Sequence, residues 1–395
     1  MMNTLLKNQV LSHNNTSRPL PFKFVELLFP RILVQQLRTN TLHDKHETKD
    51  RQPDNFFRLH KSKGQHLLTN PRVLDTIVRK SAINPTDTVL EIGPGTGNLT
   101  LRLLQAASKV VAVEIDERMV KFLQERASEQ GLQHKLSVTR EDALKAEFPR
   151  FDLVVANIPY GISSPLVTKL VYGEGYNFRS ATLLLQKEFA RRLLAKPGDS
   201  EFNRLAVNVK LVAEVEFVMD VSKRDFVPCP KVDSSVVIIR PKSENEIPSV
   251  NLDEWRAFTR SCFNKKNKTL GATFKQKKRV MELLNLSQMR ESEGECRRGS
   301  NDGYDFVKDD NLDDQSDDED CIAYSYSETE LTMFKRKIIE VLKTSGFEDK
   351  RPSKLSIEDL LNLLSLLNGA GIYFHDLKGA ENADNNTVLN RKDME

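Results

Sequence analysis

Cysteine is scarce in this chain, and the few cysteines lie far apart. The 395 residues include four of them, Cys229, Cys262, Cys296 and Cys321, with no C-x-x-C pair and no histidine beside them. This spacing indicates neither a disulfide framework nor a metal site, and it favours a reducing compartment. Long apolar runs are absent as well. None reaches the roughly 18 residues that a membrane-spanning helix needs, so we expect a soluble protein without membrane contact.

The sequence also lacks the dinucleotide-binding fingerprint G-x-G-x-x-G, although it contains a glycine-rich turn. In the turn, Gly93, Gly95 and Gly97 alternate with other residues, so the third glycine comes one position too early. In the fingerprint that glycine seats the helix against the strand beneath a pyrophosphate. The spacing therefore disfavours an NAD-dependent oxidoreductase.

Around this turn the sequence predicts the first half of a nucleotide-binding β-α-β unit. Residues 89–92 are typical of a short buried strand, and residues 99–104 resume a helical pattern after the glycines. A second predicted strand, 110–116, contains Glu114 about twenty positions after the first glycine. A carboxylate at this place can accept hydrogen bonds from both hydroxyl groups of a ribose, so Glu114 is a candidate cofactor ligand.

A third predicted strand, 135–139, is followed by Asp142. An acid at the carboxyl end of this strand lies along the crevice in which open α/β sheets bind ligands. Its carboxylate can accept a hydrogen bond from the exocyclic amine of adenine. A surface acid without a ligand is the alternative.

The fourth predicted strand, 151–156, runs into the turn Asn157-Ile158-Pro159-Tyr160. Proline stiffens the turn, so its carbonyl groups point in fixed directions. The Asn157 amide oxygen, a carbonyl of Ile158 or Pro159 and the Tyr160 ring offer two acceptors and a stacking face. Such a set suits the NH₂ group of a planar base, and an ordinary β-turn is the alternative.

Later segments supply further elements. We predict strands at 181–185, 205–215 and 236–239 and a helix at 187–194. Phe226 belongs to a proline-rich loop and either sandwiches a base opposite Tyr160 or is a core aromatic residue.

The segments before and after these strands also allow predictions. Asn70 followed by Pro71 predicts the start of a helix, and the loop before it, which contains His66, can fold over a cofactor. After residue 241 the pattern becomes helical, with helices predicted at 255–263, 270–284 and within 331–373.

Charge is distributed in opposing blocks although the net charge is only +3. Residues 260–279 carry eight Lys or Arg and no acid, whereas residues 302–320 carry ten acids and one lysine. Residues 1–42 hold five basic residues and a single acid, Glu26, among many Ser, Thr and Asn. The leader resembles an organellar transit peptide, mitochondrial more than chloroplast, with an ordinary disordered tail as the alternative.

Taken together, these motifs resemble those of the rRNA adenine N6,N6-dimethyltransferases, the family of bacterial KsgA and the eukaryotic dimethyladenosine transferases. The segments that carry the resemblance appear in the family's order: 64–68 (GQHLL), 91–97 (EIGPGTG), 114–116 (EID), 157–160 (NIPY), 226–234, 265–270 (KKNKTL) and 344–351 (TSGFEDKR). The last two are similar to the eukaryotic type.

The resemblance implies an enzyme that uses S-adenosylmethionine to dimethylate N6 of two adjacent adenosines in the 3′-terminal hairpin of small-subunit rRNA. It implies cofactor contacts by the residues His66, Leu68, Gly93, Gly95, Glu114, Asp142 and Asn157. The catalytic candidates are Asn157, Pro159, Tyr160 and Phe226. The RNA-binding candidates are Lys265, Lys266 and Lys268, and no metal is implied.

We therefore expect an α/β fold of the class I methyltransferase type: a Rossmann-like, mostly parallel seven-stranded sheet with helices on both faces, plus a small helical C-terminal domain. The expected organisation is a leader and linker at 1–57, a methyltransferase domain at 58–242, a helical RNA-binding domain at 243–292 and 328–374, an acidic disordered insertion at 293–327 and a disordered tail at 375–395.

The sequence leaves some alternatives open. We expect a mitochondrial monomer that acts on small-subunit rRNA or a pre-ribosomal particle, with the nucleolus as the alternative location. An RNA-binding ribosome-assembly or mitochondrial transcription factor of the same fold is the main alternative function. A DNA adenine or protein-glutamine methyltransferase is disfavoured because Ile158 stands where those enzymes usually have a proline.

Overall fold

The structure of the chain is a computed structural model that describes residues 66–173, 175–292 and 326–375. The predicted leader, the tail after residue 375 and nearly all of the acidic insertion lie outside the described residues. Within those ranges no helix is long and apolar enough to cross a membrane.

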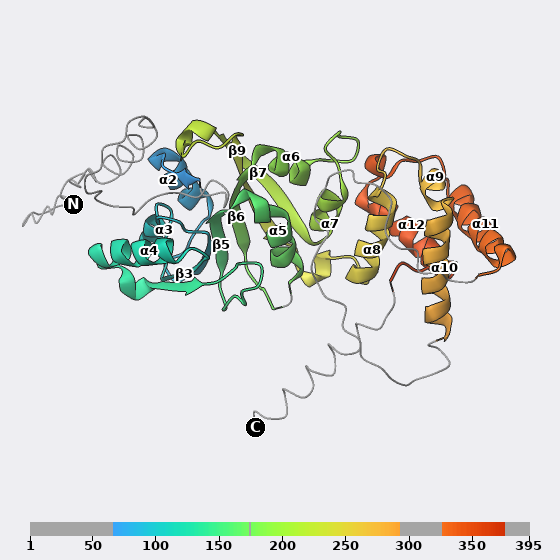
Figure 1. The fold of residues 1–395 in the computed structure, drawn as a ribbon, viewed down its shortest axis with the longest axis horizontal. Helices are drawn as coiled ribbons and strands as arrows, with labels where there is room; N and C mark the ends of the chain where they lie inside the picture. The colour runs from blue at the N-terminus through green and yellow to red at the C-terminus, as the bar shows by residue number, and fades with distance from the viewer. Residues whose placement is uncertain (1–65, 174, 293–325, 376–395) are drawn as a thin grey trace, which may run out of the picture. The chain divides into compact units, whose positions relative to one another are not determined.

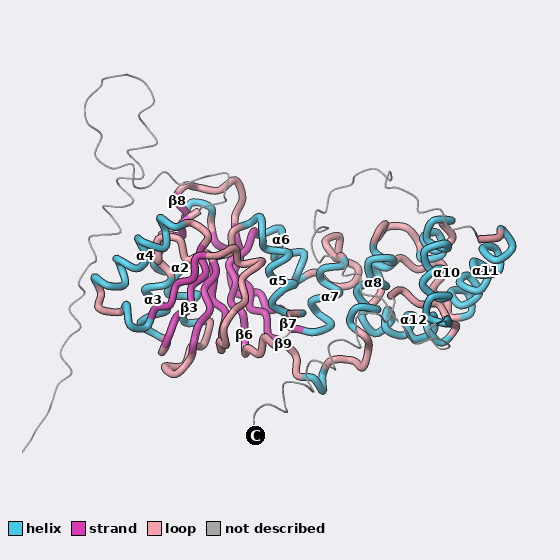
Figure 2. The backbone as a smooth tube through the Cα atoms, turned by 60° about the horizontal axis from the view of Figure 1, so that its bottom comes forward, coloured by secondary structure: helices cyan, strands magenta, loops and turns pink. Residues whose placement is uncertain are grey.

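A seven-stranded sheet organises the first part of the described chain (Figures 1 and 2). Its strands are β2 (Thr88–Ile92), β3 (Lys109–Glu114), β4 (Leu136–Arg140), β5 (Leu153–Asn157), β6 (Ser180–Gln186), β7 (Ala213–Val221) and β9 (Ser234–Pro241). Their order in the sheet is β4-β3-β2-β5-β6-β9-β7. The pairs among β2 to β6 are parallel, and β9 runs antiparallel to both of its neighbours. This topology confirms the predicted Rossmann-like, mostly parallel sheet.

Helices cover both faces of the sheet because successive strand residues point to opposite sides. In β2, Val89 packs into one apolar cluster, and Leu90 and Ile92 pack into another. The helices whose residues join the first cluster are α2 (Pro71–Lys80), α3 (Thr100–Ala106) and α4 (Glu117–Glu129). Those that join the second are α5 (Ser163–Tyr172), α6 (Lys187–Leu194) and α7 (Arg204–Val212).

Helix α2 begins where the sequence predicts. The side chain of Asn70 accepts a hydrogen bond from the backbone N–H of Arg72 at 3.0 Å, and Pro71 occupies the first helical position. The N-cap satisfies a backbone donor that the helix itself cannot pair, which fixes the start of the helix directly after the loop that contains His66.

The predicted strand 205–215 is wrong over most of its length, because Arg204–Val212 is the helix α7 and β7 starts only at Ala213. Val207 and Leu211 pack into one apolar cluster and Val209 packs into another. A helix that is buried on two sides shows no amphipathic pattern, so its apolar run imitates a buried strand. The informative signal was Asn203, whose side chain caps the helix by accepting hydrogen bonds from two backbone N–H groups.

The C-terminal part of the described chain is helical, as predicted. Its helices are α8 (Leu252–Phe263), α9 (Leu270–Phe274), α10 (Lys277–Ser292), α11 (Glu328–Thr344) and α12 (Ile357–Gly369). The prediction of one helix over 270–284 is wrong, since the chain breaks between α9 and α10. Tertiary contacts hold α9: the N–H groups of Leu270 and Gly271 donate to the carbonyls of Lys350 and Glu348.

A third apolar cluster joins these helices to the sheet-bearing part. It contains Phe202 and Leu211 from the segment around α7, Trp255 and Phe258 from α8, and Leu363 from α12, all at most 1% exposed. Helix α7 therefore packs in two apolar clusters, this third one and the second one beside the sheet.

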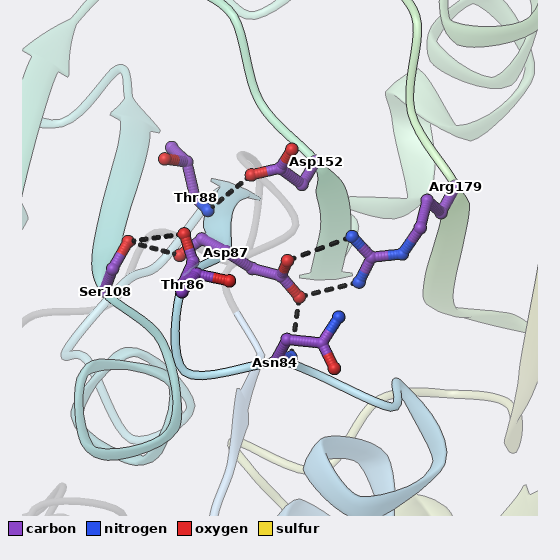
Figure 3. Close-up of polar contacts among 7 residues, drawn as sticks. All are labelled: Asn84, Thr86, Asp87, Thr88, Ser108, Asp152 and Arg179. Carbon is purple, nitrogen blue, oxygen red and sulfur yellow. Dashed lines mark hydrogen bonds and ion pairs between the residues drawn. The ribbon is translucent and has the colours of Figure 1, made fainter.

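The amino ends of the parallel strands are joined by a dense polar network (Figure 3). The Asp87 carboxylate accepts two hydrogen bonds from the Arg179 guanidinium, at 2.9 and 2.6 Å, and one from the backbone N–H of Asn84 at 2.6 Å. The bonds to Arg179 lower the pKa of Asp87, whose side chain is only 5% exposed.

Neighbouring strands are attached to the same network (Figure 3). The Ser108 hydroxyl donates to the carbonyls of Thr86 and Asp87, and the Thr88 N–H donates to the Asp152 carboxylate at 2.8 Å. The starts of β2, β3 and β5 and the chain before β6 are thereby fixed to one another.

Candidate active site

A cavity lies at the opposite, carboxyl ends of β2, β3 and β5, which are adjacent in the sheet. Its empty space, including the open mouth, is about 850 Å³. The predicted site residues that line it are His66, Leu68, Gly93, Gly95, Glu114, Asn157, Pro159 and Tyr160. The structure thus brings together residues that are up to about ninety positions apart in the chain, as His66 and Asn157 are.

The glycine-rich turn after β2 takes a backbone form that suits glycine. Gly93, Gly95 and Gly97 all have positive φ, at +66°, +55° and +82°. A Cβ atom on Gly93 would lie 3.2 Å from a ring carbon of Pro159, and one on Gly97 would lie 2.5 Å from a methyl carbon of Leu123. The alternating glycines therefore let the turn approach both the Asn157–Tyr160 segment and helix α4.

Glu114, at the end of β3, is a buried carboxylate that faces the turn. One of its oxygens accepts the Gly95 N–H at 3.1 Å and the other accepts the Asp116 N–H at 3.0 Å. Burial raises the pKa of Glu114, and these two hydrogen bonds oppose the increase. A carboxylate has about four acceptor positions, so Glu114 retains capacity to accept hydrogen bonds from a ligand.

A second buried carboxylate, Glu91 in β2, also lines the cavity and is one of the residues that the sequence prediction missed. It is 1% exposed, and its Oε2 atom has no hydrogen-bond partner among the described residues. Burial raises the pKa of Glu91 to about 8; a hydrogen bond with the Thr100 side chain opposes the increase, and the negative charge of Glu114 adds a smaller contribution to it. The Thr96 hydroxyl, which lines the same cavity, is likewise buried and unpaired within the described chain. Unpaired buried polar atoms are rare and point to a missing ligand or water.

The turn Asn157–Tyr160 follows β5 directly and is held from several sides. The Asn157 side-chain N–H donates to the His66 carbonyl at 3.1 Å, which leaves its amide oxygen for another donor. The Pro159 carbonyl accepts the N–H of Ile162, so of the two predicted carbonyl acceptors the one on Ile158 is available. The Ile158 side chain is 1% exposed and packs in the core.

Tyr160 is half-buried and positioned by two contacts. Its hydroxyl lies 2.8 Å from the Ser234 Oγ, and its ring stacks on the His66 imidazole with centroids 5.8 Å apart and planes inclined by 28°. Burial raises the pKa of Tyr160, so its hydroxyl stays protonated at neutral pH. The ring orientation is therefore fixed before any base arrives.

A short two-stranded ladder closes one side of the cavity. In it β1 (Leu67–Leu68) pairs antiparallel with β8 (Phe226–Val227), and the His66 Nδ1 lies 2.8 Å from the Pro228 carbonyl. Phe226 is 2% exposed and packs in the cluster beneath α2 and α3. Of the two predictions for Phe226, this burial bears out a core aromatic residue rather than a ring that stacks on a base, because an aromatic ring within this core offers no open face.

The remaining predicted residues lie elsewhere. Asp142 follows β4, next to β3, and is not among the residues that line the cavity. Ile115, which the sequence prediction missed, lines the cavity directly after Glu114 and is 59% exposed. An apolar residue directly after the strand-end acid was the available signal for it.

The predicted RNA-binding lysines occupy the loop between α8 and α9, outside the cavity lining. The Lys266 Nζ donates to the carbonyls of Ser200 and Phe202, at 2.8 and 3.3 Å, so this lysine fastens the loop to the rest of the fold. Lys265 and Lys268 are exposed. The part of the chain that the structure describes contains no group of three or more His, Cys, Asp or Glu arranged to hold a metal ion.

Comparison with known proteins gives consistent matches. The sequence profile of the family described as "Ribosomal RNA adenine dimethylase" matches residues 56–292. A protein of Arabidopsis thaliana named "Ribosomal RNA small subunit methyltransferase, mitochondrial" is 58% identical over 94% of this chain and 97% of its own length. A "Probable dimethyladenosine transferase" of Drosophila melanogaster is 43% identical over 79% of this chain and 91% of its own.

The fold has a solved counterpart as well. The crystal structure of a dimethyladenosine transferase from Plasmodium falciparum matches 78% of this chain and 100% of its own, with 37% identity and a TM-score of 0.64.

Proposed function

This chain belongs to the ribosomal RNA adenine dimethylase family, and we propose that it transfers methyl groups from S-adenosylmethionine to N6 of two adjacent adenosines in the 3′-terminal hairpin of small-subunit rRNA. One observation carries the proposal: a single cavity is lined both by buried carboxylates that suit a cationic cofactor and by the Asn157–Tyr160 turn that suits an adenine.

The donor set of the cavity fits S-adenosylmethionine, which carries an ammonium and a sulfonium group. The unpaired oxygen of Glu91 is complementary to such a positive charge. The free lone pairs of Glu114 suit the two ribose hydroxyls, and the exposed Ile115 offers an apolar wall to adenine. We assign Asp142 to the adenine amine because it follows the strand next to Glu114.

The glycine turn and the short strand β1 complete the cofactor site in this proposal. Gly93 and Gly95 let the cofactor approach the backbone, which no Cβ atom obstructs. His66, directly before β1, and Leu68, within it, cover the cavity, and the Leu68 carbonyl is fixed by the Asn98 side chain at 2.9 Å.

When bound, the cofactor supplies a methyl group that its sulfonium already activates. Adenine N6 is a poor nucleophile because its lone pair is delocalised into the ring. The Asn157 amide oxygen and the Ile158 carbonyl accept the two N6 hydrogens, which favours a pyramidal nitrogen whose lone pair faces the methyl group. Alignment of this kind supplies much of the rate acceleration, and no general base is needed because the amine becomes acidic once it is alkylated.

The target adenine must leave its stack before it reaches this turn, at a cost of a few kcal/mol that is smaller for an unpaired loop base. Stacking on the Tyr160 ring returns about 1–3 kcal/mol of that cost. We assign Lys265 and Lys268 to the RNA backbone and Lys266 to support of their loop.

We further propose that the enzyme is a monomer that acts in mitochondria. The basic, acid-poor leader over residues 1–42 and the name of the Arabidopsis thaliana relative support this location. A fluorescent reporter fused to residues 1–58 should enter mitochondria, and accumulation in the nucleolus would support the alternative.

The central test is methyl incorporation. Purified protein is offered methyl-labelled S-adenosylmethionine and precursor small subunits, and the label is mapped on the rRNA. We expect dimethylated adenosine at two adjacent positions near the 3′ end. Tight cofactor binding without label in the rRNA would instead favour an RNA-binding assembly factor of the same fold.

A further inference from the structure

Lys169, in the last turn of α5, is bonded to the backbone of another segment. Its ammonium group lies within hydrogen-bond distance of three backbone carbonyls, those of Ala143 at 3.0 Å, Leu144 at 3.1 Å and Ala146. An ammonium group has three donors, so this arrangement uses all of them. The side chain is half-buried, and its Nζ also lies 4.3 Å from the centre of the Phe148 ring.

The three carbonyls belong to one tight turn that begins at Asp142. The N–H groups of Lys145 and Ala146 donate to the Asp142 carbonyl at 2.9 and 2.8 Å, and the Leu144 N–H donates to the Asp142 side chain at 3.0 Å. The turn resembles the first turn of a helix that does not continue. The three carbonyls of the turn therefore have no backbone donor among the described residues. The Lys169 ammonium, from α5, donates to them instead.

This contact joins two parts of the site. The residue before the turn, Glu141, donates its N–H to the carbonyl of Glu114 at 3.1 Å, so the turn starts beside the strand end that we assign to the ribose. Helix α5 begins at Ser163, three residues after Tyr160. Lys169 thus connects the turn of Asp142 to the helix that follows the Asn157–Tyr160 segment.

We propose that Lys169 is a positioning residue for the adenine end of the cofactor site, acting through the turn that carries Asp142. The proposal rests on the proposed function, in which Asp142 receives the adenine amine. Without the ammonium, three carbonyls of a partly buried turn lose their donors, and the turn and Asp142 shift to reach water. Ala143 and Ala146, 7% and 1% exposed, show how little water reaches the turn in its present position.

The test uses the full chain and measures cofactor affinity by calorimetry, with S-adenosylmethionine and S-adenosylhomocysteine as probes. Lys169→Met keeps the apolar stem and removes the donors. We expect its Kd for both probes to rise about tenfold. This factor corresponds to the loss of roughly one hydrogen bond to a charged group, the bond between the adenine amine and the Asp142 carboxylate. At saturating cofactor, kcat should stay within about twofold, and Lys169→Arg, which keeps donors and charge, should recover most of the affinity. Lys145→Met is the matched control, because this lysine belongs to the same turn but is exposed, and its affinity should equal that of the wild type.

A double-mutant cycle separates positioning from simple support of the fold. If Lys169 acts through Asp142, the Kd of Lys169→Met combined with Asp142→Ala should be close to that of Asp142→Ala alone. Additive losses, or an unchanged Kd with a lower Tm, would overturn the positioning role. Should the methionine variant melt below the assay temperature, Lys169→Gln, which keeps two N–H donors but no charge, gives the same cycle. Failure of the wild-type protein to bind either probe would overturn the proposed function itself, whereas normal wild-type binding with an unaffected Lys169→Met variant would overturn only the role of Lys169.

Discussion

The two ends of strand β2 carry buried carboxylates in opposite situations. Asp87 precedes the strand and is saturated with partners, two from Arg179 and one from Asn84, and its pKa is lowered. Glu91, four residues later, has an unpaired oxygen and a pKa raised to about 8. Burial of a charge costs free energy unless it is paired, so the first acid is placed for stability and the second is retained at a cost. The contrast teaches that the amino end of the sheet supports the fold, whereas the carboxyl end is arranged for a ligand.

The largest effect should come from removing the acceptor at the ligand end. Asn157→Ala is expected to lower kcat for rRNA methylation by at least about 1,000-fold, because the amide oxygen that orients N6 is lost. Cofactor affinity should fall far less than kcat, although Asn157 is also a candidate cofactor contact, and Tyr160→Ala should behave similarly. Single-turnover methylation assays measure the loss.

Asn84→Ala is the matched control for that variant, since Asn84 is an exposed asparagine at the opposite end of the sheet. Its kcat should equal that of the wild type. Near-normal turnover of Asn157→Ala would contradict the assignment of the catalytic turn.

The second effect concerns the amino end of β2, where we expect a loss of stability without a loss of activity. Asp87→Ala should lower the free energy of unfolding by about 2 kcal/mol, because it removes three hydrogen bonds, two of them to a charged partner. The kcat of the folded protein should not change. Urea unfolding measures the loss, and Asp75→Ala, which removes an exposed partner of Arg102, should cost less than about 0.5 kcal/mol.

The sign of the pH effect follows from the lowered pKa of Asp87. The folded state binds its proton less readily than the unfolded chain does, so the contribution of Asp87 is fully present at neutral pH. It is lost as the pH falls through the ordinary range of a carboxyl group and then through the lower folded pKa. A wild-type stability advantage over Asp87→Ala that did not shrink in acid would contradict this account.

A third, smaller effect concerns Glu91 and the cofactor. With a pKa of about 8, Glu91 is protonated in the free protein at pH 6.5, whereas a bound cation favours its ionised form. Cofactor binding should therefore release a proton, and the affinity should rise roughly tenfold between pH 6.5 and 8. Calorimetry in buffers of different ionisation enthalpy measures both quantities. Glu91→Gln should bind more weakly and with little dependence on pH over this range, and a pH dependence equal to that of the wild type would exclude Glu91 as its source.

The raised pKa of Glu91 also has a consequence for the stability of the free protein. The unfolded chain releases the proton at an ordinary carboxyl pKa, whereas the folded protein keeps it up to about pH 8. The stabilising effect of the protonated form is therefore fully present below the ordinary carboxyl pKa and is lost progressively as the pH rises from there through about 8.

The smallest effect concerns two lysines of the loop between α8 and α9: Lys266, which is bonded to backbone carbonyls, and Lys268, which is exposed. Lys268→Ala should weaken RNA binding about two- to threefold and reduce the salt dependence, the slope of log K against log salt, by about one. Lys266→Ala should mainly lower stability, since its ammonium is bonded to the carbonyls of Ser200 and Phe202. Filter binding at several salt concentrations, with urea unfolding in parallel, distinguishes the two variants, and equal salt slopes would contradict the division of roles.

Much of the fold could be predicted because its signals are local. The strands around β2 are short apolar runs bounded by turn residues, and the N-cap Asn70 with Pro71 fixes α2. Where packing on two sides hides the periodicity, as in α7, the same reasoning predicted a strand. The break between α9 and α10 depends on contacts with Glu348 and Lys350, which are distant in sequence and therefore invisible to a local pattern.

The site shows the same division. Residues within compact motifs, such as Gly93, Glu114 and Asn157, meet in one cavity as predicted. For Phe226 the sequence left both a stacking ring and a core aromatic residue open, because whether an aromatic ring is exposed depends on the tertiary fold, which buries this one. Glu91 was missed because a carboxylate within an apolar strand acquires its character from burial and from one oxygen atom left unpaired among the described residues, neither of which the sequence displays.

The double membership of α7 has a practical consequence for anyone who wishes to isolate the catalytic half. Ending the chain after β9 would strip α8 to α12 from one side of α7 and leave Phe202, Val207 and Leu211 facing solvent. A fragment with such an uncovered apolar flank would be prone to self-association. A minimal recombinant enzyme should therefore retain α8 to α12, because these helices cover the apolar side of α7.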